Sequence, residues 1–579
     1  MSINVKVNGI AVSVPEGSTI LQAAHIAGVE IPTLCYMKEI NEIGACRMCL
    51  VEATGARGLA TACVYKVSEG MEIKTNTEKV QQARRTTLEL LLSTHERRCL
   101  SCVRSENCEF QKLCRDYGVE VEDKYDGYKP EYPLDTSCAH LVRDNNKCVL
   151  CRRCVAACSE QFVSVIGAND RGIHTHIGTP YEKNLADVPC VSCGQCIVAC
   201  PTGALREKDD TDKVWAALND PSKHVVVQTA PSIRATLGEE FGMEIGTNVE
   251  GKMVAALRRL GFAKVFDTDF AADLTIVEEA NALVERLLKN GALPMITSCS
   301  PGWVKFAEYY YPQLLGHLST CKSPQQMAGA VIKTYYAEKN GIDPKDIVSV
   351  SIMPCTAKKF EVGRDDENAA GVADVDIALT TRELGRMIKR AGIDFVKLPD
   401  EEFDSPLGED TGAAVIFGAT GGVMEAALRT ANDWLTGKDN KEIEFKEVRG
   451  TEGIKEAVYT IAGKEIKVAA VSGIKNANYV MSRIADGTAD WAFVEVMCCP
   501  GGCVNGGGQP IQPSSVRNFT DLKALRAKAL YDQDASMALR KSHESPIIKE
   551  LYANWFDGFG GPKAHHALHT SYTARKKYN

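Results

Sequence analysis

The sequence VEVMCCPGGCVNGGGQP, at residues 494–510, contains three cysteines within six residues and is rich in glycine. The thiols of Cys499 and Cys503 can converge on one inorganic centre, and glycines let the backbone approach a bulky group that a Cβ atom would exclude. A flexible loop with buried structural cysteines is the alternative. Further cysteines in similar contexts in the same half of the chain favour a site. The glycines concerned are Gly501, Gly502, Gly506, Gly507 and Gly508.

Composition predicts a large soluble metalloprotein. The 579 residues exceed what one core holds, and 45% hydrophobic with 25% charged residues is typical of globular proteins. The net charge of −8 argues against nucleic-acid binding and permits a basic partner surface. No stretch approaches the roughly 18 apolar residues of a membrane span, and the first residues lack a signal pattern, so we expect a cytoplasmic protein. The 23 clustered cysteines favour zinc, copper(I) or iron–sulfur clusters over disulfides.

The first domain, predicted at residues 1–78, begins with alternating apolar residues on both sides of Asn8-Gly9, which is typical of a β-hairpin with a type I′ turn. A helix is expected at 18–27. Four cysteines follow with the spacing C-x10-C-x2-C-x13-C, which resembles a ferredoxin-type [2Fe–2S] domain, with zinc as the alternative. The long first gap is similar to the first cluster domain in the large iron–sulfur subunit of respiratory NADH dehydrogenases. These cysteines are Cys35, Cys46, Cys49 and Cys63.

The second domain, predicted at residues 79–118, combines a helix at 80–92 with one histidine and three cysteines. By spacing alone a zinc site and a [4Fe–4S] cluster are equally compatible. The same NADH dehydrogenase subunit resembles this chain here too, which favours the cluster. Cys114 and Cys138 fall outside the pattern and are expected to be buried thiols. The predicted ligands are His95, Cys99, Cys102 and Cys108.

The third domain, predicted at residues 139–209, repeats the spacing C-x2-C-x2-C-x3-C, with Ser159 in place of a proline after the first copy. Such a repeat is typical of two [4Fe–4S] clusters that exchange their fourth ligands. A series of cluster domains without a substrate pocket predicts an electron wire. The first cluster is assigned to Cys148, Cys151, Cys154 and Cys200, and the second to Cys190, Cys193, Cys196 and Cys158.

The fourth domain, predicted at residues 210–579, alternates buried strands with amphipathic helices, which indicates an α/β fold with mostly parallel sheets. Ligands of such sheets bind beyond the carboxyl ends of strands, so five loops, including 418–422, are expected to converge on one site. Loop 418–422 matches no nucleotide fingerprint. The predicted strands are 225–228, 295–296, 347–352, 413–417, 468–471 and 491–496, with helices at 252–260, 277–289 and 423–430.

Three signatures in this domain resemble those of the [FeFe]-hydrogenases, specifically the long form with four accessory clusters: TSCSPGW at 297–303, MPCTAKKFE at 353–361 and EVMCCPGGCVNGGG at 495–508. The resemblance implies multidomain α+β and α/β architecture, with ferredoxin-like iron–sulfur domains before a large α/β H-cluster domain. It implies reversible interconversion of H2 with protons and electrons. The implied cofactors are one [2Fe–2S], three accessory [4Fe–4S] and the H-cluster, a [4Fe–4S] cube joined to a two-iron unit with CO, cyanide and an azadithiolate bridge.

The resemblance also implies roles for individual residues. Cys503 corresponds to the ligand that bridges the cube and the two-iron unit, and Cys355 and Cys499 to further cube ligands. Lys358 corresponds to the lysine at one cyanide. The implied proton relay runs through Cys299, Glu279, Ser319 and Arg286. The residues implied to line the cavity are Ala230, Pro231, Ser232, Gln325, Met353, Phe417 and Met497.

Two departures from the family pattern leave questions open. Ser300 replaces the usual fourth cube cysteine, and Cys498 replaces a usual alanine, so either could be the fourth ligand. Ala282 stands where the relay would end in a carboxylate, and Glu278, Glu285 or water could replace it. An H2 or redox sensor, or a non-catalytic iron–sulfur scaffold, is the alternative to an enzyme.

The expected electron partner is ferredoxin or a flavin-containing, NAD(P)H-oxidising subunit, which would make this chain the catalytic subunit of an NAD(P)-linked hydrogenase. No nucleotide fingerprint is present, so NAD(P)H chemistry would require another polypeptide. Neither nucleic acid nor a membrane is expected as a partner. The histidines and lysines of residues 565–578 are expected in a surface tail or final helix.

Overall fold

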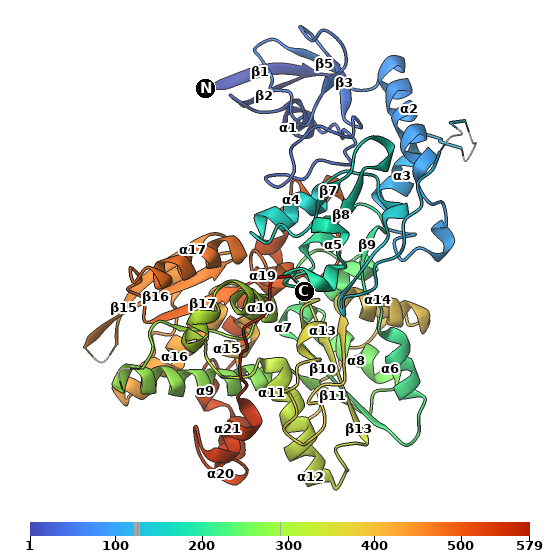
Figure 1. Cartoon of the computed structure of the whole chain (residues 1–579). Coiled ribbons are helices and arrows are strands. Elements are labelled where there is room, and N and C mark those ends of the chain that lie inside the picture. The colour runs from blue at the N-terminus through green and yellow to red at the C-terminus, as the bar shows by residue number, and fades with distance from the viewer. Residues whose placement is uncertain (121–123, 126–127, 290, 462, 579) are drawn as a thin grey trace.

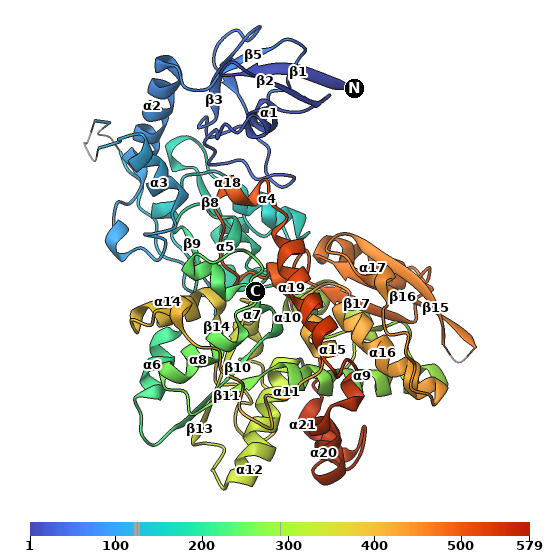
Figure 2. The same ribbon diagram turned by 180° about the vertical axis from the view of Figure 1, so that it is seen from behind.

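The chain extends from a small N-terminal sheet domain through a cysteine-rich middle to a large α/β body (Figure 1). The computed structural model describes residues 1–120, 124–125, 128–289, 291–461 and 463–578. The carboxyl end of the chain lies near the centre of the molecule in both views (Figures 1 and 2). None of the described helices is both long and apolar enough to cross a membrane.

The N-terminal domain is built on the predicted hairpin. Strands β1 (Ser2–Val7) and β2 (Ile10–Pro15) pair antiparallel, and Asn8 and Gly9 between them have φ of 49° and 87°, as a type I′ turn requires. The predicted helix is α1 (Ile20–Ile26). The sheet has the order β2-β1-β5-β3-β4 and is completed by β3 (Leu50–Ala53), β4 (Ala60–Thr61) and β5 (Glu72–Lys74).

The middle of the chain is helical, and a buried ion pair within it also hydrogen-bonds to Ser514 of the C-terminal part. Arg153 is fully buried and donates to both carboxylate oxygens of Glu109 at 2.9 and 3.2 Å and to the Ser514 hydroxyl at 2.7 Å. These three residues come from α4, α3 and α18, so one guanidinium joins three segments. The helices are α2 (Glu78–Thr94), α3 (Glu109–Asp116), α4 (Arg153–Glu160), α5 (Gln195–Ala199) and α18 (Ser514–Arg517). Two strand pairs accompany them: β6 (Leu141–Arg143) with β9 (Leu205–Glu207), and β7 (Gly167–Asn169) with β8 (His176–Gly178).

The described part of the large body contains two four-stranded sheets. The first, β11-β10-β13-β14, is parallel throughout, and the second, β12-β17-β16-β15, has only β15 antiparallel to its neighbour. The first consists of β10 (His224–Thr229), β11 (Lys264–Asp267), β13 (Ile347–Met353) and β14 (Ile377–Thr380). The second consists of β12 (Met295–Ile296), β15 (Ile454–Ile461), β16 (Lys464–Ser472) and β17 (Phe493–Met497).

Five of the six predicted strands are confirmed, but the prediction of a strand at 413–417 is wrong. These residues form α15 (Gly412–Val415) and a 3₁₀ turn at Ile416–Gly418, and all are buried. A short, wholly apolar run does not distinguish a strand from a buried helix. The three predicted helices are confirmed as α8 (Glu250–Leu260), α9 (Asp269–Leu288) and α16 (Gly422–Thr436), although α9 begins eight residues earlier than expected.

The C-terminal segment folds back onto the large body. Its helices are α19 (Leu522–Ser536), α20 (Pro546–Asn554) and α21 (Pro562–Leu568), which confirms a final helix. After α21 the chain pairs with residues 320–322: the Lys322 amide donates to the Leu568 carbonyl at 2.8 Å, and the Thr570 amide donates to the Thr320 carbonyl at 2.8 Å. The last described residues are therefore part of the body.

We predict that Arg153→Met weakens the attachment of the cluster domains by about 3–5 kcal/mol, because Glu109 would stay buried without its bidentate partner. Limited proteolysis and hydrogen exchange of residues 79–118 should reveal the loosened attachment. The control is Arg152→Met, because Arg152 is adjacent in sequence but exposed. Equal protection of residues 79–118 in both variants would contradict the prediction.

Candidate active site

The first cysteine quartet is assembled in the N-terminal domain. The amides of Cys35 and Cys46 each donate to the other residue's sulfur at 3.4 Å. The Cys35 thiol lowers the pKa of Cys46 to about 6, and the Cys49 thiol raises the pKa of Cys63. The charges of Cys35 and Cys46 also act on Cys63, so all four predicted ligands lie together.

The second group includes the buried imidazole of His95. Burial lowers the pKa of His95 to about 4, and its Nδ1 has no hydrogen-bond partner among the described residues. A neutral imidazole with a free nitrogen has the chemistry of a metal ligand. Cys102 and Cys108 lie close enough for their charges to interact. Cys114 is partly buried and lies near Cys99 and Cys108.

The eight cysteines of the third domain form two groups, and each contains one thiol from the other motif. Burial is the largest cause of the raised pKa of Cys154, and the next largest causes are the charges of the other three thiols of its predicted quartet. The same holds for Cys196 and its quartet. Helices α4 and α5 pack against each other and carry the exchanged thiols into place. The groups are Cys148, Cys151, Cys154 and Cys200, and Cys158, Cys190, Cys193 and Cys196.

The main site lies where loops after β12, β13 and β17 meet. Burial raises the pKa of Cys355, and the Cys499 and Cys503 thiols raise it further. Burial also raises the pKa of Cys503 to about 12. Cys299 lies close to Cys503 and to Glu279, and its pKa is raised by burial and then by these two groups. Three sequence-distant loops thus bring four thiols together, of which that of Cys499 is buried and the other three are partly buried.

The glycines of the 494–510 stretch allow backbones to pack against each other. A Cβ atom on Gly506 would lie 2.2 Å from the Pro354 carbonyl oxygen, and one on Gly507 would lie 2.2 Å from the Cys193 carbonyl oxygen. Real Cβ atoms do not approach this closely. The described neighbours of these two glycines are therefore the backbones of the Cys355 loop and of the nearest accessory-cluster loop, whereas the sequence indicated close approach to a bulky group.

Lys358 is anchored beside the thiols. Its Nζ donates to the Ser323 hydroxyl at 2.8 Å, to the Glu361 carboxylate at 2.9 Å and to the Cys299 carbonyl at 3.3 Å. Gln325 also donates to Glu361, at 2.9 Å. Sequence reasoning missed Glu361, although the i, i+3 spacing from Lys358 within MPCTAKKFE would have indicated a partner.

The other residues expected to line the cavity are buried around this region. Ser232 follows β10 in α7 (Pro231–Arg234), and its hydroxyl accepts from Gln509 at 3.2 Å. Gln509 also donates to the Cys503 carbonyl at 3.0 Å, which links the β10 loop to the cysteine loop. Phe417 and Met497 belong to the apolar cluster that Cys299 contacts. The remaining predicted residues, Ala230, Pro231, Gln325 and Met353, are also buried.

Cys498 and Ser300 are neighbours. The Cys498 amide donates to the Ser300 hydroxyl at 3.3 Å. The Cys498 thiol lies beside the thiols of Cys193 and Cys499, which with burial raise its pKa well above the usual value. The glycine at position 302 leaves room for the Cys498 thiol, because a Cβ atom there would lie 2.7 Å from the Cys498 sulfur.

The predicted relay is only partly connected. Burial raises the pKa of Glu279 to about 7, and neither carboxylate oxygen has a hydrogen-bond partner among the described residues, although Ser319 and the Ser298 amide lie close enough to lower that pKa. Arg286 donates instead to the carbonyls of Ala292, His317 and Leu318 at 2.9–3.2 Å. Ala282 packs at the edge of the Cys299 apolar cluster.

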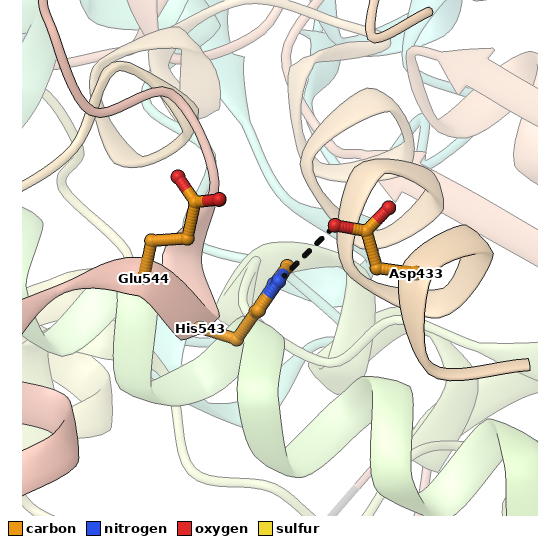
Figure 3. Close-up of side chains that lie close together, drawn as sticks. All are labelled: Asp433, His543 and Glu544. Carbon is orange, nitrogen blue, oxygen red and sulfur yellow. Dashed lines mark ion pairs between the residues drawn. The ribbon is translucent and has the colours of Figure 1, made fainter. Parts of the chain in front are cut away.

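A second group with ligand chemistry consists of Asp433, His543 and Glu544 (Figure 3). His543 Nε2 lies 3.3 Å from Asp433, but the same carboxylate oxygen pairs with Lys541 at 2.5 Å. The lysine already balances this carboxylate, so the contacts attach the C-terminal segment to α16.

Comparison with known families covers most of the chain. Residues 223–507 match the C-terminal domain of the iron-only hydrogenase large subunit, and residues 520–575 match the iron hydrogenase small subunit. Residues 1–78 match a 2Fe-2S iron-sulfur cluster binding domain, residues 84–122 the iron-sulfur binding region of NADH-ubiquinone oxidoreductase-G, and residues 147–204 a 4Fe-4S dicluster domain.

Individual relatives agree with these matches. The chain is 47% identical to the NADP-reducing hydrogenase subunit HndD of Solidesulfovibrio fructosivorans, over 99% of each chain. It is 46% identical to iron hydrogenase 1 of Clostridium pasteurianum, over 98% of this chain and 99% of the other. A solved variant of the [FeFe]-hydrogenase HydA1 of Chlamydomonas reinhardtii matches with a TM-score of 0.58 and 40% identity, over 64% of this chain and 100% of the other.

We predict that Gly507→Ala disrupts the junction between the cysteine loop and the accessory-cluster loop, because the new Cβ atom would collide with the Cys193 carbonyl. Iron bound per chain should fall, and the wild-type far-ultraviolet circular dichroism should be retained. Gly316→Ala is the control, since no heavy atom lies within 4 Å of the position of its Cβ. Wild-type iron content in Gly507→Ala would refute the proposed reason for this glycine.

Proposed function

The chain belongs to the iron-only, or [FeFe], hydrogenases, oxidoreductases that interconvert H2 with protons and electrons, and from this we propose roles for its own residues. The observation that carries the proposal is the convergence of Cys355, Cys499 and Cys503 beside the free thiol of Cys299 and the ammonium of Lys358. The thiols of Cys355, Cys499 and Cys503 provide a metal site, and the adjacent thiol of Cys299 provides the start of a proton path.

The residues present fit an H-cluster. Cys355, Cys499 and Cys503 would supply thiolates to hold the group, and thiolates are the ligands that iron–sulfur clusters require. When bound, this group supplies the open iron and the bridging amine at which H2 is cleaved heterolytically. Lys358 Nζ is held by Ser323 and Glu361 and can donate to a cyanide ligand.

The first proton carriers are Cys299 and Glu279. The high pKa of Cys299, which burial causes, keeps its thiol protonated, so it passes a proton without becoming a ligand. Glu279 has a pKa of about 7 and therefore accepts and releases protons near neutral pH. Ser319 lies next along this path, and Arg286 contributes positive charge rather than a direct hydrogen bond.

The fourth cube ligand is proposed to be Cys498. Its thiol lies beside Cys499, whereas the Ser300 hydroxyl accepts from the Cys498 amide and so positions that residue. A thiolate also suits iron–sulfur clusters better than a neutral hydroxyl.

The alanine at position 282 leaves the outer end of the proposed proton relay without a carboxylate of its own.

Electrons are proposed to travel through the accessory groups to a redox partner. The [2Fe–2S] cluster is assigned to Cys35, Cys46, Cys49 and Cys63, and the three [4Fe–4S] clusters to His95 with its three cysteines and to the two quartets of the third domain. Cys193 belongs to the last quartet and lies beside Cys498, so this cluster adjoins the H-cluster site.

The partner is ferredoxin or a flavin-containing subunit that reacts with NAD(P)H. Whole-chain similarity to a subunit named as NADP-reducing favours the second, and co-purification of a flavoprotein tests it. A cytoplasmic location stays a prediction.

We predict that Cys299→Ser lowers methyl-viologen-driven H2 evolution by about 10²–10⁴-fold, because a hydroxyl is a much weaker proton carrier in this position. Anaerobically matured Cys299→Ser should keep the infrared bands of CO and cyanide, whereas Cys503→Ser should lose them. Cys138→Ser serves as the control outside the site and should evolve H2 at the wild-type rate. Full activity of Cys299→Ser would rule out this relay. Wild-type protein that shows the CO and cyanide bands but evolves no H2 would contradict the proposed catalytic activity.

We predict that Cys498→Ala loses the cube, because three thiolates remain for four iron corners. Iron content and the electron paramagnetic resonance of the cube measure this without reference to turnover. The double variant Cys498→Ala/Ser300→Cys should regain the cube by moving the thiol to the usual family position, and Ser300→Cys alone is the control. A complete cube in Cys498→Ala would show that this thiol is not the fourth ligand.

A further inference from the structure

The proton path needs an outer end that position 282 does not provide. Glu279 is 1% exposed, and Ala282, one turn further along α9, carries no ionisable group. Glu285 lies further along the helix, but its side chain is 55% exposed and pairs with Lys289 at 3.1 Å. A proton on Glu279 therefore requires another route to the surface.

Glu278, the neighbour of Glu279, is buried in a set of polar groups that the proposed mechanism does not yet use. It is 1% exposed, and Tyr552 of α20 donates a hydrogen bond to its Oε1. Its Oε2 lies 3.3 Å from His569 Nε2. A buried carboxylate bonded to an imidazole is a pair that can exchange a proton within one hydrogen bond.

Cys321 lies near both of the adjacent glutamates. Consecutive residues on a helix point in different directions, so a third group has to bridge Glu279 and Glu278. The Cys321 thiol is fully buried, and its pKa is raised by burial and then by the charges of both glutamates, so it lies near each of them. The Cys321 amide donates to the hydroxyl of Ser319, a residue of the proposed inner path, at 3.3 Å.

His569 connects this buried set to solvent. Its Nδ1 lies 2.8 Å from the hydroxyl of Thr320, an exposed residue. Its ring also stacks on the exposed His565, with centroids 4.5 Å apart and an interplanar angle of 10°. Pairing of residues 568–570 with 320–322 fixes the position of His569, which lies at the C-terminal end of the final helix α21.

We propose that Cys321, Glu278 and His569 form the outer part of the proton path, with exit at Thr320 and His565. This rests on the proposed inner relay through Cys299 and Glu279. No described group hydrogen-bonds to the Glu279 carboxylate, so outward transfer uses water on either side of Cys321. One water takes the proton of neutral Glu279 and gives a proton to the Cys321 sulfur, and the S–H proton of Cys321 passes through a second water to the Glu278 carboxylate. Glu278 gives that proton to His569 Nε2, and Nδ1 releases one towards Thr320 or solvent. Each group regains its charge, and no electron moves.

The test compares matured holoenzymes that carry Glu278→Gln, His569→Ala or the control His566→Ala. His566 is the exposed neighbour on α21, with no described contact to Glu278. We expect H2 evolution to fall about tenfold or more in the first two variants and to stay at the wild-type rate in the control. The signals of the reduced accessory clusters should be unchanged in all three, because electron delivery does not involve these residues.

A second readout separates a proton carrier from a packing residue. Imidazole added to the assay should restore H2 evolution in His569→Ala and should not affect Glu278→Gln, and the solvent deuterium isotope effect should rise in both. Wild-type rates in both variants would overturn this exit, as would loss of rate in Glu285→Gln without loss in Glu278→Gln. A low rate in His569→Ala without imidazole rescue would also overturn it. A wild type without H2 evolution would instead count against the inner mechanism.

Discussion

The site depends on close backbone contact at residues 506–508. Gly506 and Gly508 pack on Pro354, and Gly507 packs on Cys193. This contact joins three loops without intervening side chains: the cysteine loop after β17, the Cys355 loop after β13 and the innermost accessory-cluster loop. Thiols from distant parts of the chain can share one centre only if their backbones come this close. Electron transfer requires the two centres to lie close together. The same contact brings the innermost accessory-cluster loop next to the main site.

Electrostatics around the site follow from burial. Desolvation raises the pKa of Cys299, Cys355 and Cys503, which disfavours free thiolates and leaves metal coordination as the means of stabilising them. Cys299 lies beside Glu279 and so remains a thiol. One buried environment therefore suits both the proposed cluster ligands and the proposed proton carrier, although all of them are cysteines. Lys358 is the nearby positive charge, and Ser323 and Glu361 restrict where it can reach.

Sequence motifs predicted which cysteines lie together better than they predicted the structure around them. Ligand spacing is local, so the quartet exchange in the third domain could be read from Cys158 and Cys200. The strand expected at 413–417 was wrong because a fully apolar run has no periodicity to interpret. The roles of Glu361 and His569 depend on contacts with Lys358 and Glu278 that only the fold creates. In the same way, Gly506 and Gly507 indicated close approach, but only the structure identified the approaching backbone.

The C-terminal segment forms part of the wall beside Glu278 through its pairing at Cys321 and His569. The same segment, residues 520–575, matches a family described as the iron hydrogenase small subunit. Covalent continuity replaces association between two chains by an intramolecular step, with an effective concentration on the order of millimolar for a short flexible connection. Assembly of this wall is therefore independent of protein concentration, and dilution cannot remove it.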